Sequence, residues 1–165
     1  SGNLLSTVSV FTESTPVNLV SNPSFEADGW TTTPTAWNRW AANTASYQAI
    51  KVENNGVTGS YKLTHWLDTT YEASTYQNIT GLSNGTYTLS AWVLNSGGQD
   101  TVQLYAKNYG GSERNVDLPV SPEKWVKVKI ENIQVTNGRI EIGVYSKANA
   151  NNWMNLDHVK LYKTN

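Results

Sequence analysis

Apolar and polar residues alternate with a period of two in several stretches of this chain. In Thr101–Lys107 every second residue is apolar, and the residues between them are polar or aromatic. The same alternation occurs in Tyr87–Val93, Arg139–Tyr145 and Leu156–Tyr162. Successive side chains of a β-strand point to opposite faces, so each stretch predicts a half-buried strand. The expected inward residues of the first three stretches are Leu89, Ala91, Val93, Val102, Leu104, Ala106, Ile140, Ile142 and Val144.

Glycine and asparagine separate these stretches, as at Asn54–Gly56, Ser83–Gly85, Ser96–Gly98 and Asn137–Gly138. Such pairs are typical of tight turns between strands, and no segment has a convincing helical period. Short strands with regular turns predict an all-β fold, a β-sandwich of the jelly-roll type.

The chain is expected to form a single domain over residues 16–165. Its 165 residues are enough for a full hydrophobic core. Residues 1–15 are rich in serine and threonine, and we interpret them as a linker or N-terminal extension with a short strand at Val8–Phe11.

The aromatic composition suggests a ligand with both apolar and polar surface. Seven tryptophans and nine tyrosines accompany only two phenylalanines. Tryptophan and tyrosine combine an apolar ring with a polar group, and they are favoured where one side is dry and the other wet. A sugar ring offers a flat, partly apolar face and many hydroxyls, so this surplus predicts a carbohydrate ligand.

Charge and cysteine content exclude several other classes of function. A net charge of -1, from 12 basic and 13 acidic residues, gives no reason to expect nucleic acid or a membrane as partner. No apolar run is long enough to span a bilayer, and no signal peptide is visible after Ser1, so a leader is expected upstream. Without cysteine the chain has neither disulfides nor a thiol nucleophile.

The polar faces of the predicted strands form the first candidate binding surface. If the strands are neighbours, one sheet face carries aromatic rings for stacking and amide or ammonium groups for sugar hydroxyls. The alternative is that these side chains pack under a covering loop. The members of this set are Trp92, Gln103, Tyr105, Lys107 and Tyr145.

Further candidates lie at strand ends and in loops. His65 and Trp66 end the strand-like run from Tyr61, where binding residues are often found, although a lone histidine can equally be structural. Trp153 lies among asparagines in Asn149–Asn155. It either clamps a sugar ring or closes one end of the core. The pair in Trp37–Trp40 is ambiguous, and we assign Trp30 and Trp125 to the core. 

Two acidic residues near opposite ends of the domain are candidates for a metal site. Terminal strands of a sandwich commonly lie together, which would bring Glu26 close to Asp157. Two carboxylates together with backbone carbonyls are suitable ligands for Ca²⁺. The alternative is two solvated acids, and the spacing does not decide between them.

A catalytic role is not expected. The two histidines, His65 and His158, lack a serine or cysteine motif around them, and neither G-x-S-x-G nor H-E-x-x-H occurs. Asp68, the acid nearest to His65 and Trp66, has no evident carboxylate partner of the kind that a glycosidase requires.

The chain resembles a known family in several stretches. Asn18–Glu26, Gly29–Trp30 and Asn155–Leu161 are similar to the two ends of jelly-roll carbohydrate-binding modules. Four central stretches are similar to carbohydrate-binding module family 61, whose members accompany bacterial family 53 endo-β-1,4-galactanases and bind β-1,4-galactan. These stretches are Gly59–Trp66, Thr75–Trp92, Tyr105–Gly111 and Asn152–Trp153.

This resemblance implies a secreted, extracellular and non-catalytic module, monomeric and appended to a bacterial glycoside hydrolase. It implies a structural Ca²⁺ held by Glu26 and Asp157, with carbonyls from near Ser24 and Gly59. The chain departs from the family pattern at His158, where many relatives have a second acid. The remaining alternatives are a module for another plant cell-wall glycan and a structural spacer domain. The implied sugar-binding residues are His65, Trp66 and Trp153, with Lys107, Tyr109 and Asn152 nearby, in addition to Trp92 and Tyr105 from the strand pattern.

Overall fold

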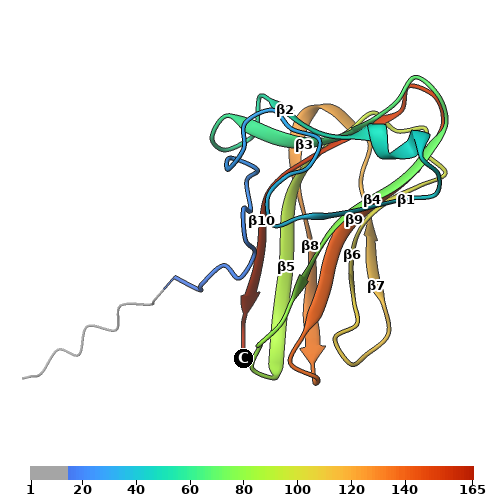
Figure 1. Ribbon diagram of the computed structural model, residues 1–165. Helices are drawn as coiled ribbons and strands as arrows, with labels where there is room; N and C mark the ends of the chain where they lie inside the picture. Colours follow the sequence, from blue (N-terminus) through green and yellow to red (C-terminus); the bar gives the residue numbers. More distant parts are fainter. Residues whose placement is uncertain (1–14) are drawn as a thin grey trace, which may run out of the picture.

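The computed structural model describes residues 15–165, which form two antiparallel five-stranded sheets packed face to face (Figure 1). The first sheet has the strand order β1-β4-β9-β6-β7, and the second has the order β2-β3-β10-β5-β8. The predicted β-sandwich is therefore confirmed. The strands of the first sheet are β1 (Asn38–Ala41), β4 (Tyr71–Ile79), β9 (Ile140–Ala148), β6 (Thr101–Lys107) and β7 (Arg114–Asp117). Those of the second are β2 (Ile50–Asn54), β3 (Tyr61–Trp66), β10 (Trp153–Lys163), β5 (Gly85–Asn95) and β8 (Ser121–Val135).

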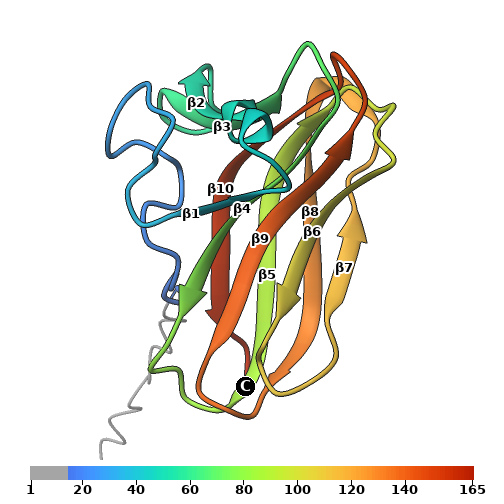
Figure 2. The same ribbon diagram turned by 45° about the vertical axis from the view of Figure 1, so that its right-hand side comes forward.

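Strand periodicity placed the core correctly. All nine residues expected to point inward are buried between the sheets, with at most 8% of their surface exposed. A 3₁₀ helix, η1 (Ala45–Ala49), is the single helical element of the described residues, and it lies at one end of the sandwich (Figure 2). No helix in residues 15–165 is long and apolar enough to cross a membrane. The strand expected at Val8–Phe11, and nearly all of the expected linker 1–15, lie outside the described residues.

The first described residues run beside the last strand. The amide of Leu19 donates to the carbonyl of Leu161, and the amide of Val159 donates to the carbonyl of Pro23. The side-chain amide of Asn18 also donates to the carbonyl of Val159. These bonds join segments that are far apart in sequence, so the two ends of the domain meet along β10, as expected.

Two tryptophans assigned to the core from the sequence lie elsewhere. Trp30 is in the loop before β1, with 69% of its surface exposed. Trp125 is in β8, where Val126 and Val128 pair with the inward residues of β5, so Trp125 points outward and is half-buried. Both predictions were wrong, because a tryptophan in a strand pattern or after a glycine does not show which face of the sheet it occupies.

Candidate functional site

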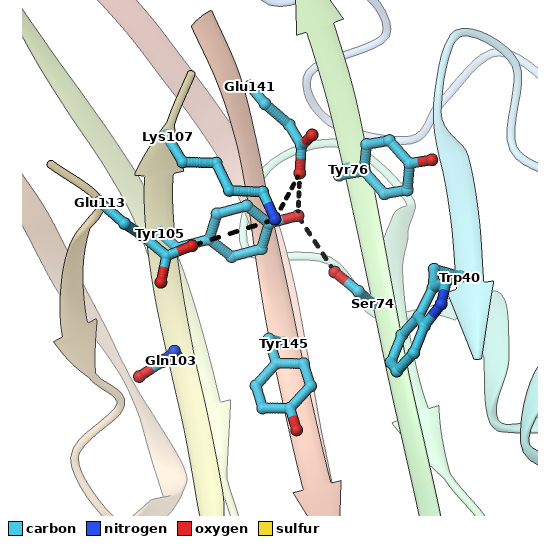
Figure 3. Close-up of a pocket in the computed structure, with 9 residues that line it drawn as sticks. All are labelled: Trp40, Ser74, Tyr76, Gln103, Tyr105, Lys107, Glu113, Glu141 and Tyr145. Atoms are coloured by element: carbon cyan, nitrogen blue, oxygen red, sulfur yellow. Dashed lines mark hydrogen bonds and ion pairs between the residues drawn. The ribbon is translucent and has the colours of Figure 1, made fainter. Parts of the chain in front are cut away.

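A groove crosses the outer face of the first sheet. Antiparallel pairing sets Trp40 beside Ser74, Ser74 beside Tyr145, and Tyr145 beside Gln103, which places these side chains in one row from β1 to β6. The groove has a volume of about 400 Å³. Figure 3 shows the aromatic rings of Trp40, Tyr76 and Tyr145 arranged around its centre.

Gly143 makes room for the floor of this groove. Gly143 lies between Tyr76 and Tyr105 in the neighbouring strands. A Cβ at this position would come within 2.8 Å of the Tyr105 hydroxyl and 2.7 Å of the Thr75 carbonyl oxygen. Because glycine has no side chain, the Tyr105 ring can lie over the strand, with only 5% of its surface exposed.

The hydroxyl of Tyr105 is fully engaged beneath the groove. It donates to Glu141 Oε2 at 2.8 Å and lies 3.2 Å from the Ser74 hydroxyl, which itself donates to the carbonyl of Val144. Burial raises the pKa of Tyr105 well above its usual value, so the hydroxyl keeps its proton. The floor is thus a neutral aromatic surface held in place by hydrogen bonds.

Charged groups close one end of the groove. Lys107 Nζ lies 3.6 Å from Glu141 and 4.0 Å from Glu113 (Figure 3). The same ammonium lies 5.3 Å from the centre of the Tyr105 ring. On the central strand β9, the Tyr145 hydroxyl donates to Glu72, and burial followed by this bond raises the pKa of Tyr145 to about 12.

This arrangement suits a neutral sugar chain. Trp40 is 42% exposed at the edge strand β1 and can stack on the C–H face of a ring. Ammonium, amide and carboxylate groups around it can pair with hydroxyls. Aromatic rings for stacking beside polar groups for hydroxyls are the features of a binding surface.

A second aromatic surface lies on the opposite side of the sandwich. Trp66 in β3 pairs directly with Trp153 in β10, and both are half-buried on the outer face of the second sheet. Trp92 in β5 lies on this face too, opposite Lys127 of β8. The expectation that Trp92 shares a face with Tyr105 was therefore wrong, because β5 and β6 belong to different sheets.

The structure also corrects the predictions for His65 and Tyr109. His65 is completely buried between the sheets, with Nε2 2.8 Å from the Thr75 hydroxyl and Nδ1 3.0 Å from the Ser146 hydroxyl. Burial, helped by the charge of Lys51, lowers its pKa from 6.5 to about 3. Tyr109 is 4% exposed and belongs to the core. Neither ring can reach a surface ligand.

Two other predicted residues have roles that the structure clarifies. Asn152 accepts a hydrogen bond from the amide of Asn149 and so stabilises the turn before β10. Lys107 lines the groove, as expected from its strand position. Sugar contact by Lys107, Tyr105, Trp66 and Trp153 stays a prediction.

Sequence reasoning missed several residues of the groove. Alternation in Tyr71–Ile79, where Ser74 and Tyr76 alternate with inward residues, would have placed these two on the outer face. Trp40 was considered in the sequence but left ambiguous. Alternation in Arg139–Tyr145 already places Glu141 outward, but only strand pairing shows that it lies beside Lys107. Glu113 precedes β7 and carried no local signal.

The two acids considered for a metal site do come together. The amides of Ser60 and Tyr61 each donate to Glu26 at 2.7 Å. Asp157, which is fully buried, accepts from the amides of Thr58 at 3.0 Å and of His158 at 2.8 Å. Both carboxylates are thus held against the loop between β2 and β3, and not solvated separately.

The chemistry of this pair fits a hard cation. Burial raises the pKa of Asp157 from 3.8 to about 6, and the negative charge of Glu26 contributes. A Cβ on Gly59 would lie 2.3 Å from Glu26, so this glycine allows the carboxylate to approach the backbone. Within residues 15–165, no three His, Cys, Asp or Glu side chains are grouped so that they could hold a metal ion by themselves. A cation here would therefore take its other ligands from backbone, hydroxyl or water oxygens, for which the Ser24 hydroxyl is near, 3.4 Å from that of Thr58.

The fold and the groove define the class of this protein as a β-sandwich carbohydrate-binding module. The family 16 carbohydrate-binding module-2 has the same fold, with a TM-score of 0.54 and 17% identity over 88% of this chain and 100% of that one. No family model matches the sequence.

A structure of TmCBM61 in complex with beta-1,4-galactotriose is more similar, with a TM-score of 0.76 and 27% identity. The match covers 89% of this chain and 99% of that chain. The resemblance to carbohydrate-binding module family 61 is thereby confirmed, and with it a non-catalytic, sugar-binding class of protein.

A curated relative is much longer than this chain. The sequence is 28% identical over 170 residues to a 1,6-alpha-glucosyltransferase of Sporosarcina globispora. That match covers 97% of this chain but only 13% of the relative.

Proposed function

We propose that this module binds β-1,4-galactan in the groove of the first sheet and holds an appended glycoside hydrolase, an endo-β-1,4-galactanase, on that polysaccharide. The observation that carries the proposal is the row of aromatic and polar side chains across the sheet. The likeness to TmCBM61, which was solved with β-1,4-galactotriose, supports galactan as the ligand.

The groove is long enough for several sugar units. It runs from Trp40 on the edge strand β1 across β4, β9 and β6 to Glu113, which directly precedes the opposite edge strand β7. Four interstrand spacings of about 4.8 Å give a length of roughly 19 Å. Internal chain segments then bind across the strands, with rings stacked on Trp40 and hydroxyls bonded to groups such as Gln103 and Lys107.

Binding of this kind aids an enzyme through local concentration. A tethered module keeps the hydrolase near an insoluble substrate without taking part in the reaction. Such a role fits a monomeric module of a secreted bacterial enzyme. The affinity of one module is modest, because sugar–protein hydrogen bonds largely replace sugar–water bonds.

The proposal includes a structural Ca²⁺ at Glu26 and Asp157. Carbonyls near Ser24 and Gly59 are the other expected ligands. A cation would neutralise the buried carboxylate of Asp157, and it would join the N-terminal segment to β10. Ca²⁺ takes six to eight oxygen ligands in flexible geometry, which suits a site with two carboxylates and nearby backbone.

Affinity electrophoresis in galactan gels tests the ligand and the site. The wild-type module should be retarded, and Trp40→Ala should lose about tenfold in affinity, roughly 1.4 kcal/mol, with the loss of a stacking ring. Trp30→Ala is the matched control, because Trp30 is exposed, does not line the groove and precedes Thr31, which bridges to Val52 of the second sheet. This substitution should leave retardation unchanged. Equal retardation of all three proteins would refute the groove as the site.

The likeness to a 1,6-alpha-glucosyltransferase favours a second candidate ligand, an α-glucan. The same gels cast with a soluble α-glucan distinguish the two, because retardation there and not on galactan would change the ligand assignment. Retardation on another plant cell-wall glycan would do the same. A spacer domain would show no retardation on any glycan and no change in tryptophan fluorescence.

A further inference from the structure

The outer face of the second sheet carries its own hollow, opposite the groove. This hollow has a volume of about 460 Å³ and is lined by residues of β2, β3, β5 and β10, with Pro122 from β8. Trp66 and Trp153 form its aromatic part, and Thr64 and Asn155 lie beside them in the next row of the sheet. We name it the Trp66 face.

The floor of the Trp66 face presents an unused acceptor. The Asn155 side-chain amide donates to the Thr64 hydroxyl at 2.7 Å and to the Leu63 carbonyl at 3.5 Å. Its Oδ1 accepts no hydrogen bond from the described residues, although every deeply buried side-chain polar atom among them has a partner. This oxygen is therefore available to a ligand hydroxyl.

The Trp66 face is positively charged. Lys51 and Lys62 line it together with one acid, Glu53. Lys51 Nζ lies over the Trp66 ring, 4.9 Å from its centre, in a cation–π contact that holds the ammonium at the aromatic surface. The ion pairs within residues 15–165 involve Lys107 and Lys129, so neither Lys51 nor Lys62 is neutralised by a carboxylate within 4.0 Å.

The surroundings of the hollow extend this charge. Lys127 of β8 pairs with Trp92 of β5 on this same outer face. The groove of the first sheet is different, because its one lysine, Lys107, is shared between Glu113 and Glu141. An anionic chain would be repelled there and attracted to the opposite side.

We propose that the Trp66 face is a second glycan-binding site, separate from the groove, which takes a polysaccharide segment bearing carboxylates. Trp66 and Trp153 stack on the sugar rings, Lys51 and Lys62 pair with the carboxylates, and Asn155 Oδ1 accepts a hydroxyl. One module then holds a neutral chain on one side and an acidic chain on the other. This inference does not depend on the proposed ligand of the groove.

Calorimetric titration with polygalacturonate at low salt tests this site. The matched ligand is fully methyl-esterified polygalacturonate, which keeps the chain and removes its charge. We expect the wild type to bind the free acid, to bind the ester at least about tenfold more weakly, and to lose affinity at 0.5 M NaCl because salt screens exposed charges. Equal binding of both forms, or binding of neither, would overturn the proposal.

Variants on the two faces show where the acidic chain lies. Lys51→Gln with Lys62→Gln should weaken polygalacturonate binding about tenfold, with the melting temperature unchanged, because both side chains are partly exposed. Lys163→Gln, at the end of β10, is the matched lysine control and should bind as the wild type does. Trp40→Ala, in the groove, should also bind normally.

Three results would contradict this arrangement. Polygalacturonate binding that survives the double lysine substitution rejects the Trp66 face. Binding that is lost in Trp40→Ala places the acidic chain in the groove. A dimer of the wild-type module in analytical ultracentrifugation that Trp153→Ala dissociates makes the face a contact between copies. Failure of the groove to bind galactan would leave the polygalacturonate results unaffected, so the two proposals fail separately.

Discussion

Acidification should destabilise this module through His65. The ring is completely buried, and its nitrogens lie within 3.0 Å of the Thr75 and Ser146 hydroxyls, so it links the two sheets as a neutral imidazole. Burial first, and the charge of Lys51 second, lower its pKa to about 3 in the folded protein. In the unfolded chain the same ring titrates near 6.5.

The direction of the effect follows from proton uptake. Below pH 6.5 the unfolded chain binds a proton at His65 that the native state does not bind, so the free energy of unfolding falls as the pH falls toward 3. Each unit of pKa difference corresponds to about 1.36 kcal/mol. Between pH 7 and pH 4 the loss from this residue is therefore about 3 kcal/mol, a large part of the stability of a typical domain.

Urea unfolding followed by tryptophan fluorescence at pH 7 and pH 4 measures this loss. His65→Gln keeps hydrogen-bonding groups near the two hydroxyls and does not titrate, and every other acid and base is common to both proteins. The wild type should lose about 3 kcal/mol more than the variant on acidification. His158→Gln is the control. It retains His65, so its free energy of unfolding should fall between pH 7 and pH 4 as much as that of the wild type. Equal losses in the wild type and His65→Gln would refute the argument.

Two further predictions concern the groove floor and the metal site. Gly143→Ala should cost about 2 kcal/mol in the free energy of unfolding, because the added Cβ would meet the Tyr105 hydroxyl and the Thr75 carbonyl at 2.8 and 2.7 Å; an unchanged urea midpoint would show that the floor packs differently. Chelator should lower the melting temperature of the wild type by several degrees, since a ligand of the native state raises its stability. Glu26→Gln should abolish this response, and the same response in the variant would exclude Glu26 as a ligand.

The sequence predicted what depends on local periodicity. Alternation of period two depends only on neighbouring residues, and it placed Leu89, Val102 and Ile142 in the core. The meeting of Glu26 and Asp157 was one of two alternatives that the spacing left open, and only the family resemblance favoured it. The β-sandwich followed from the number of such runs and their turns.

What depends on strand pairing could not be predicted in this way. β5 and β6 follow one another along the chain but enter different sheets, so Trp92 and Tyr105 lie on opposite sides of the molecule. His65 looked like a surface residue at a strand end. Its true environment depends on hydroxyls from β4 and β9, which approach only when the sheets pack.

The floor of the groove has a consequence for changing what this module recognises. Tyr105 is held over Gly143 by packing from below and by hydrogen bonds to Glu141 and Ser74, so it does not have to become ordered when a ligand arrives. Preorganisation of this kind saves conformational entropy on binding, and it also makes the floor a fixed shape. A different glycan therefore has to be accommodated at the rim, where Trp40 is exposed on an edge strand, and redesign of specificity should start there.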